Sequence, residues 1–229
     1  MINQLPFVGV EFVDNPEPRC PCVLLLDTSG SMRGQAIAAL NQGVELLAEE
    51  LSADPLARER IELAVITFGD EVQVIQDFVS PAAFMPPRFE ADGNTPMGRA
   101  VLAGCEVLEE RKHAYQSAGV NYFRPWMFLI TDGEPTDYNT DMWRKAVELT
   151  RQAEASRNFI FYGVAVNDAN QSKLNELCPP HRLAQKLRGL NFGELFSWLS
   201  CSLRSVSLVN PGVTRPILPP MTDWALVKA

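Results

Sequence analysis

Residues 22–27 constrain the fold more than any other segment, because a run of apolar residues ends directly in Asp27-Thr-Ser-Gly-Ser31. A short apolar run that stops at Asp, Ser and Gly predicts a fully buried strand followed by a turn. From Gln35 to Leu51 the apolar residues recur at helical spacing instead. The sequence therefore predicts a buried strand, a polar turn and an amphipathic helix in succession.

The rest of the chain repeats this alternation of strands and helices. Gly69-Asp70 joins two of the expected strands and indicates an antiparallel hairpin. Thr95 is expected to cap a helix that has Pro96 at its first position. Further strands are expected at residues 7–13, 61–68, 72–79, 126–130, 159–166 and, more weakly, 183–187; further helices are expected at 141–156, 170–177 and 191–203. The pattern predicts an α/β fold with a mostly parallel sheet that helices cover on both faces.

Composition and charge narrow the classes of function. The 229 residues are 46% hydrophobic and 21% charged, as in an ordinary globular protein. The net charge of −8 argues against a nucleic-acid binder and against docking on an anionic membrane. The first residues do not resemble a signal peptide, and the longest apolar run, residues 159–166, is far shorter than the roughly 20 residues needed to cross a bilayer. We therefore expect a soluble, cytoplasmic protein.

The five cysteines predict free thiols. Their odd number and wide spacing do not fit a secreted disulfide framework. Cys20 and Cys22 flank a proline, but no second pair of Cys or His residues has the spacing of a zinc site.

Three polar clusters follow strand ends or precede helices, where open α/β sheets bind ligands. Asp27, Ser29 and Ser31 present one carboxylate and two hydroxyls from one turn, and Gly30 lets its backbone bend. Thr95 adds a hydroxyl. Asp132 adds a second carboxylate. Hard oxygen ligands of this kind suit Mg²⁺ or Mn²⁺. Taken singly, each cluster is also explained as a turn or a helix cap.

The segment Val23-Leu-Leu-Leu-Asp-Thr-Ser-Gly-Ser-Met32 resembles the opening strand and motif of von Willebrand factor type A domains. The metal-ion-dependent adhesion site of that family is Asp-x-Ser-x-Ser, then a Thr, then an Asp. The matching positions here are Asp27, Ser29, Ser31, Thr95 and Asp132. The resemblance spans about residues 20–205. It implies a Rossmann-like sheet with one antiparallel edge strand, one Mg²⁺ or Mn²⁺, and a protein partner whose acidic side chain completes the metal site.

A closer resemblance is to stand-alone bacterial proteins of the tellurite-resistance Y type. It rests on Leu5-Pro6, on residues 24–32 and 65–68, and on Phe128-Leu-Ile-Thr-Asp-Gly-Glu-Pro-Thr-Asp137. In that group the gene often lies beside those of a protein kinase and a metal-dependent protein phosphatase. The resemblance implies an intracellular adaptor in a signalling or stress-resistance complex.

The expected domain, residues 20–205, lies between an N-terminal extension (1–19) and a Pro-rich tail (206–229). Gly30, Met32, Glu134 and Asp137 are candidates for supporting the metal site or facing a partner. For Glu134 and Asp137 we favour the alternative that both are solvated loop carboxylates. The tail, which includes Trp224, is either a partner-binding arm or a segment that packs on its own domain.

The sequence favours a binding module over an enzyme. Phosphotransferases of the haloacid dehalogenase type need a second Asp where Ser29 stands, and neither a P-loop nor a Gly-x-Ser-x-Gly elbow is present. His113 and His181 are expected at the surface. Two alternatives remain open: a metal-assisted hydrolase or phosphatase, and a structural subunit with a vestigial metal site.

Overall fold

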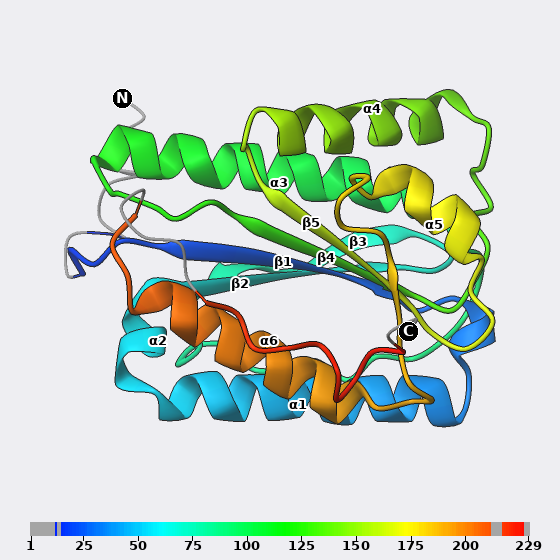
Figure 1. Cartoon of the computed structure of the whole chain (residues 1–229), viewed down its shortest axis with the longest axis horizontal. Helices are drawn as coiled ribbons and strands as arrows, with labels where there is room; N and C mark the ends of the chain where they lie inside the picture. The colour runs from blue at the N-terminus through cyan, green and yellow to red at the C-terminus, as the bar shows by residue number, and fades with distance from the viewer. Residues whose placement is uncertain (1–11, 13–14, 212–216, 227–229) are drawn as a thin grey trace, which may run out of the picture.

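A computed structural model describes residue 12 and residues 15–211 and 217–226. A six-stranded sheet forms its centre, in the order β3-β2-β1-β4-β5-β6 (Figure 1). The strands are β1 (Cys20–Asp27), β2 (Ile61–Phe68), β3 (Val72–Val79), β4 (Trp126–Thr131), β5 (Ile160–Ala165) and β6 (Gln185–Lys186). All neighbours are parallel except β3, an edge strand that pairs antiparallel with β2. The predicted fold class and the predicted hairpin are both confirmed.

Helices cover both faces of the sheet (Figure 1). On one face lie α1 (Gln35–Ala53), α2 (Pro55–Arg60) and α6 (Phe192–Ser207); on the other lie α3 (Met97–Ala118), α4 (Asp141–Ala155) and α5 (Gln171–Leu177). Alternate residues of β1 serve the two cores: Leu24 and Leu26 pack toward α1 and α6, whereas Val23 and Leu25 pack toward α3. This period of two explains why β1 reads as a continuous apolar run.

The strand order reverses between β1 and β4. From β1 the chain proceeds outward through β2 to β3, and from β4 it proceeds the other way through β5 to β6. The carboxyl ends of β1 and β4 therefore lie side by side at the switch point, with a helix departing to either side of the sheet. Asp27 ends β1 and Asp132 follows β4, so the topology itself brings these two carboxylates together.

The helix starts differ from the prediction at two places. The segment Ser52–Pro55 was expected only to end a helix, but a further helix, α2, begins at Pro55, and the Asp54 side chain accepts hydrogen bonds from Leu56 N and Ala57 N. Thr95 does not cap α3, which begins at Met97. The candidate strand at residues 7–13 lies outside the described residues, apart from Phe12.

The C-terminal tail packs on its own domain where it is described. Trp224 is buried against Trp198 of α6, with ring centroids 5.5 Å apart. Arg188 N donates to Trp224 O, and Leu226 N donates to Lys186 O, both at 2.8 Å. The backbone around Ala225 thus runs antiparallel along β6 and covers that edge of the sheet. Of the two interpretations of Trp224, the structure supports intramolecular packing.

Candidate metal site

The turn after β1 holds its own carboxylate in place. Ser29 N donates to Asp27 Oδ1 at 2.8 Å, and the Ser29 and Ser31 hydroxyls are 3.0 Å apart. Residues 30–32 form a single 3₁₀ turn with Ser29 as its N-cap residue, and the hydroxyl contact holds Ser29 and Ser31 together across this turn. Asp27 and Ser29 are buried, whereas Ser31 is exposed at the mouth of the site.

The loop after β4 closes the site from the other side. Ser31 Oγ donates to Asp132 Oδ1 at 2.5 Å. Thr131 contributes a hydroxyl that the sequence analysis missed: it donates to Asp27 Oδ2 and accepts from Gly133 N at 3.1 Å. The position of Thr131 at the end of β4, directly before Asp132, could have identified it as a site residue from the sequence. We call Asp27, Ser29, Ser31, Thr95 and Asp132 the oxygen cluster.

Thr95 reaches the cluster through loop contacts rather than through a helix cap. Gly30 N donates to Gly93 O at 3.0 Å, which joins the loop before α3 to the turn after β1. A Cβ on Gly133 would lie 2.9 Å from Thr95 Oγ1 and 3.6 Å from Asp27 Oδ2, so both oxygens border this glycine. Among the described residues, Thr95 Oγ1 has no hydrogen-bond partner. This hydroxyl beside a carboxylate is therefore available as a cation ligand.

The two carboxylates lack a compensating charge. Burial raises the pKa of Asp27 to about 6; hydrogen bonds from Ser29 and Thr131 oppose this rise, and the charge of Asp132 adds to it. Burial also raises the pKa of Asp132, against a hydrogen bond from Ser31. In the described part of the chain no Arg, Lys or His forms an ion pair with either group. A divalent cation would neutralise both carboxylates at once, so the donor set fits such an ion.

Other candidate residues take different places. Glu134 accepts hydrogen bonds from Asn170 and Lys173, both at 2.9 Å, and so turns toward α5. Asp137 accepts from Gly98 N at 3.2 Å and from Arg99 N at 2.9 Å, and so supplies the cap of α3 that Thr95 was expected to supply. Met32 is fully buried in the core below the turn, which corrects its interpretation as partner-facing.

Cysteine and histidine side chains lie elsewhere. Cys20 and Cys22 are buried in β1 as free thiols. Within the described residues no three His, Cys, Asp or Glu side chains gather as a metal site. The oxygen cluster is of another kind, since hydroxyls supply three of its five side chains. His113 lies on α3, and His181 lies 4.0 Å from Glu154.

The mostly parallel sheet with one antiparallel edge strand and helices on both faces is the fold of a von Willebrand factor type A domain. The chain belongs to this family, because the family model for the von Willebrand factor type A domain matches residues 22–188.

Solved structures show the same fold at low sequence identity. The ArnB paralog VWA2 from Sulfolobus acidocaldarius is 16% identical with a TM-score of 0.54, over 81% of this chain and 45% of that one. The pilus adhesin SpaC from Lactobacillus rhamnosus GG is 14% identical with a TM-score of 0.66, over 84% and 32%. Manganese-loaded TRAP protein from Plasmodium vivax is 18% identical with a TM-score of 0.53, over 80% and 73%.

The chain thus spans less than half the length of VWA2 and of SpaC. No match was found among curated proteins. None of the described helices is both long and apolar enough to cross a membrane.

Proposed function

We propose that this domain is a metal-dependent protein-binding module. One observation carries the proposal: two carboxylates, from Asp27 and Asp132, meet at the switch point of the sheet with hydroxyls around them and no cation of the described chain beside them. Von Willebrand factor type A domains are typically interaction and adhesion modules. Binding through an ion is the function that this set of donors supports best.

Five side chains would hold the ion directly or through water: Asp27, Ser29, Ser31, Thr95 and Asp132. We propose Mg²⁺ or Mn²⁺, because hard oxygen ligands suit both. The manganese-loaded state of the Plasmodium vivax TRAP structure supports testing Mn²⁺ beside Mg²⁺. The ion supplies a Lewis acid that accepts an external carboxylate.

Residues around the oxygen cluster would favour this contact between the ion and a partner's carboxylate. Two carboxylates leave a divalent ion near neutral, so an acidic side chain of a partner is still attracted to it. The exposed hydroxyl of Ser31 and the half-buried Gly30 border the mouth, and Arg33 is exposed beside them. We propose that Arg33 and the loop at 134–138 contribute to the choice of partner, with Glu134 and Asp137 fixing that loop rather than holding the ion.

We propose an intracellular, cytoplasmic adaptor as the biological role. The resemblance to tellurite-resistance Y-type proteins supports it and suggests a protein kinase and a metal-dependent protein phosphatase as partners. We place the module at residues 20–205. Binding is preferred to metal-assisted hydrolysis because neither His113 nor His181, the only histidines, lies at the oxygen cluster.

The test is affinity capture from native lysate in Mg²⁺, in chelator, and with Asp27→Ala. Asp168→Ala is the matched control, because Asp168 is an exposed carboxylate just beyond β5 on the same edge of the sheet. A partner that requires both Mg²⁺ and Asp27 but not Asp168 supports the proposal. A partner captured equally in all conditions would overturn it, provided that circular dichroism shows Asp27→Ala folded.

A further inference from the structure

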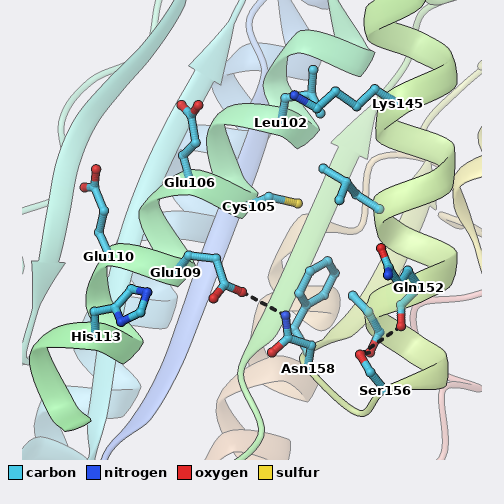
Figure 2. Close-up of a pocket in the computed structure, with 13 residues that line it drawn as sticks. Leu102, Cys105, Glu106, Glu109, Glu110, His113, Lys145, Gln152, Ser156 and Asn158 are labelled. Atoms are coloured by element: carbon cyan, nitrogen blue, oxygen red, sulfur yellow. Dashed lines mark hydrogen bonds between the residues drawn. The ribbon is translucent and has the colours of Figure 1, made fainter.

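A groove lies between α3 and α4 (Figure 2). Its volume is about 630 Å³, within the roughly 300–1,000 Å³ of typical ligand sites. Its floor is apolar and is formed by Leu102, Cys105, Leu149, Ala153 and Phe159. The groove is therefore a candidate for a second binding surface.

Its position separates it from the metal site. The first residues of α3 and α4 follow the loops that carry Thr95 and Asp132. The groove is lined by later residues, from 102–113 of α3 and from 145 onward in and after α4. A molecule in this groove would contact the sides of two helices and leave the edge of the sheet free.

The α3 side of the groove carries unused negative charge. The carboxylate of Glu109 already has partners, because it accepts a hydrogen bond from Lys112 at 2.6 Å. It also accepts one from Asn158 at 2.8 Å, which Figure 2 shows. Glu106 and Glu110 have no hydrogen-bond or ion-pair partner among the described residues. They lie four residues apart, so their carboxylates stand one helical turn apart on the same wall.

The negative charge of these glutamates affects the Cys105 thiol on the floor of the groove. Burial, reinforced by the charges of Glu109 and Glu106, raises the pKa of Cys105 to about 12, although Lys112 acts in the opposite direction. The thiol is therefore neutral at physiological pH. It packs as a small apolar side chain under a negative potential. Lys145 is exposed at the end of the groove near Leu102 (Figure 2).

We propose that this groove docks a basic amphipathic helix of a second protein. Apolar side chains of that helix would fill the floor between Leu102 and Leu149, and two Lys or Arg residues one turn apart would face Glu106 and Glu110. Charge complementarity selects this partner, because a cationic helix matches both the spacing and the sign of the free carboxylates. Lys145 would set the direction in which the partner helix lies in the groove, since an acidic end of that helix would lie against Lys145. The module would then hold two proteins at once, one through the ion and one through the helices.

The experiment uses the full chain and a synthetic helix of about 18 residues, long enough to fold on the surface, with leucines on one face and lysines one turn apart beside them. Its counterpart carries glutamates in place of the lysines. Fluorescence anisotropy at physiological salt measures binding of both peptides. Methyl NMR shifts of Leu102 and Leu149 locate the binding site.

The variant Glu106→Lys/Glu110→Lys reverses both free charges. We expect it to weaken binding of the lysine peptide about tenfold, since two attractive pairs become repulsive. The matched control is Glu45→Lys/Glu49→Lys, which reverses two exposed glutamates at the same spacing on α1, under the opposite face. Both variants change the net charge of the protein equally. If the peptide bound only through nonspecific attraction, both variants would therefore lose the same affinity for it.

The proposal is overturned if the two double variants lose equal affinity, if the glutamate peptide binds wild type equally well, or if the methyl groups of Leu102 and Leu149 do not shift. Chelator and Asp27→Ala should leave the affinity of the lysine peptide unchanged. The experiment therefore distinguishes failure of the groove proposal from failure of the proposed metal-dependent binding.

Discussion

Ser31 Oγ donates a 2.5 Å hydrogen bond to Asp132 Oδ1, although the two residues are 101 positions apart in the chain. One belongs to the turn after β1 and the other to the loop after β4, two strands paired in the middle of the sheet. The bond links the two halves of the oxygen cluster across the switch point. The cluster is therefore formed by the topology and cannot exist in a fragment that holds only one of these loops.

Mg²⁺ should stabilise the domain through this cluster. A ligand at 100 times its dissociation constant adds about 2.7 kcal/mol to the free energy of unfolding. We expect Thr95→Val to lose roughly tenfold in Mg²⁺ affinity, because one hydroxyl ligand is removed and the side-chain volume is kept. Isothermal titration calorimetry and thermal shift measure this. Thr136→Val, at an exposed threonine of the neighbouring loop, is the control and should bind as wild type does.

The metal-free protein should lose stability as the pH rises through the range in which Asp27 titrates. The pKa of Asp27 is about 6 in the folded state against 3.8 ordinarily, so between these values the unfolded chain releases a proton that the folded chain keeps. The free energy of unfolding of wild type should therefore fall relative to Asp27→Asn by about 2–3 kcal/mol from pH 4 to pH 6.5. Urea denaturation of both proteins across this range measures the difference. A difference that does not change with pH would contradict the prediction, and saturating Mg²⁺ should abolish it.

Asp137→Ala should destabilise the fold without affecting the metal. Its carboxylate caps α3 through Gly98 N and Arg99 N, and the loss of such a cap costs about 1–2 kcal/mol. Urea denaturation should show this loss, and calorimetry should show an unchanged Mg²⁺ dissociation constant. If Mg²⁺ affinity fell as far as in Thr95→Val, Asp137 would belong to the metal site instead.

Glu62→Gln should be among the most destabilising single changes. Glu62 is buried and accepts from Arg19 Nε at 3.2 Å, from Arg111 Nε at 2.7 Å and from the Tyr115 hydroxyl. Removing its charge takes away the carboxylate that pairs with the buried Arg19 guanidinium and one partner of Arg111, which costs about 3–5 kcal/mol. Thermal denaturation checks this. Glu59→Gln, at an exposed position nearby, should stay within about 0.5 kcal/mol of wild type.

Trp224→Ala should show whether the tail belongs to the domain. The indole is 1% exposed and packs on Trp198, so its removal should cost about 3–5 kcal/mol. Ile217→Ala, in the same tail but 91% exposed, should have little effect. Equal stability of the two variants in urea would show that the tail does not pack in solution.

Local patterns predicted the sheet well. The strands at 61–68 and 72–79 were predicted to the residue, because each is a run of apolar or alternating residues and Gly69-Asp70 separates them. The residues of the oxygen cluster were proposed from three motifs and a family resemblance, and the structure brings all five together.

The errors lie where distant residues decide the local structure. The hydroxyl of Thr95 does not cap α3, because the carboxylate of Asp137, some 40 positions further on, occupies that place. The ion pair of Glu134 with Lys173 also joins two distant positions and was not predicted. The start of α2 was predictable in principle, since an Asp before a Pro is a common way to begin a helix.

The way in which the tail covers β6 has a consequence for assembly. A sheet with two bare edges can add copies at both ends and grow without limit, whereas in the described part of this chain the tail lies along β6 and β3 is the edge strand that pairs on one side alone. Val74 on that strand is 47% exposed. Pairing through β3 would join two copies edge to edge, and each would bring its covered β6 edge to the outside. Growth by strand addition would thus stop at a closed twofold pair.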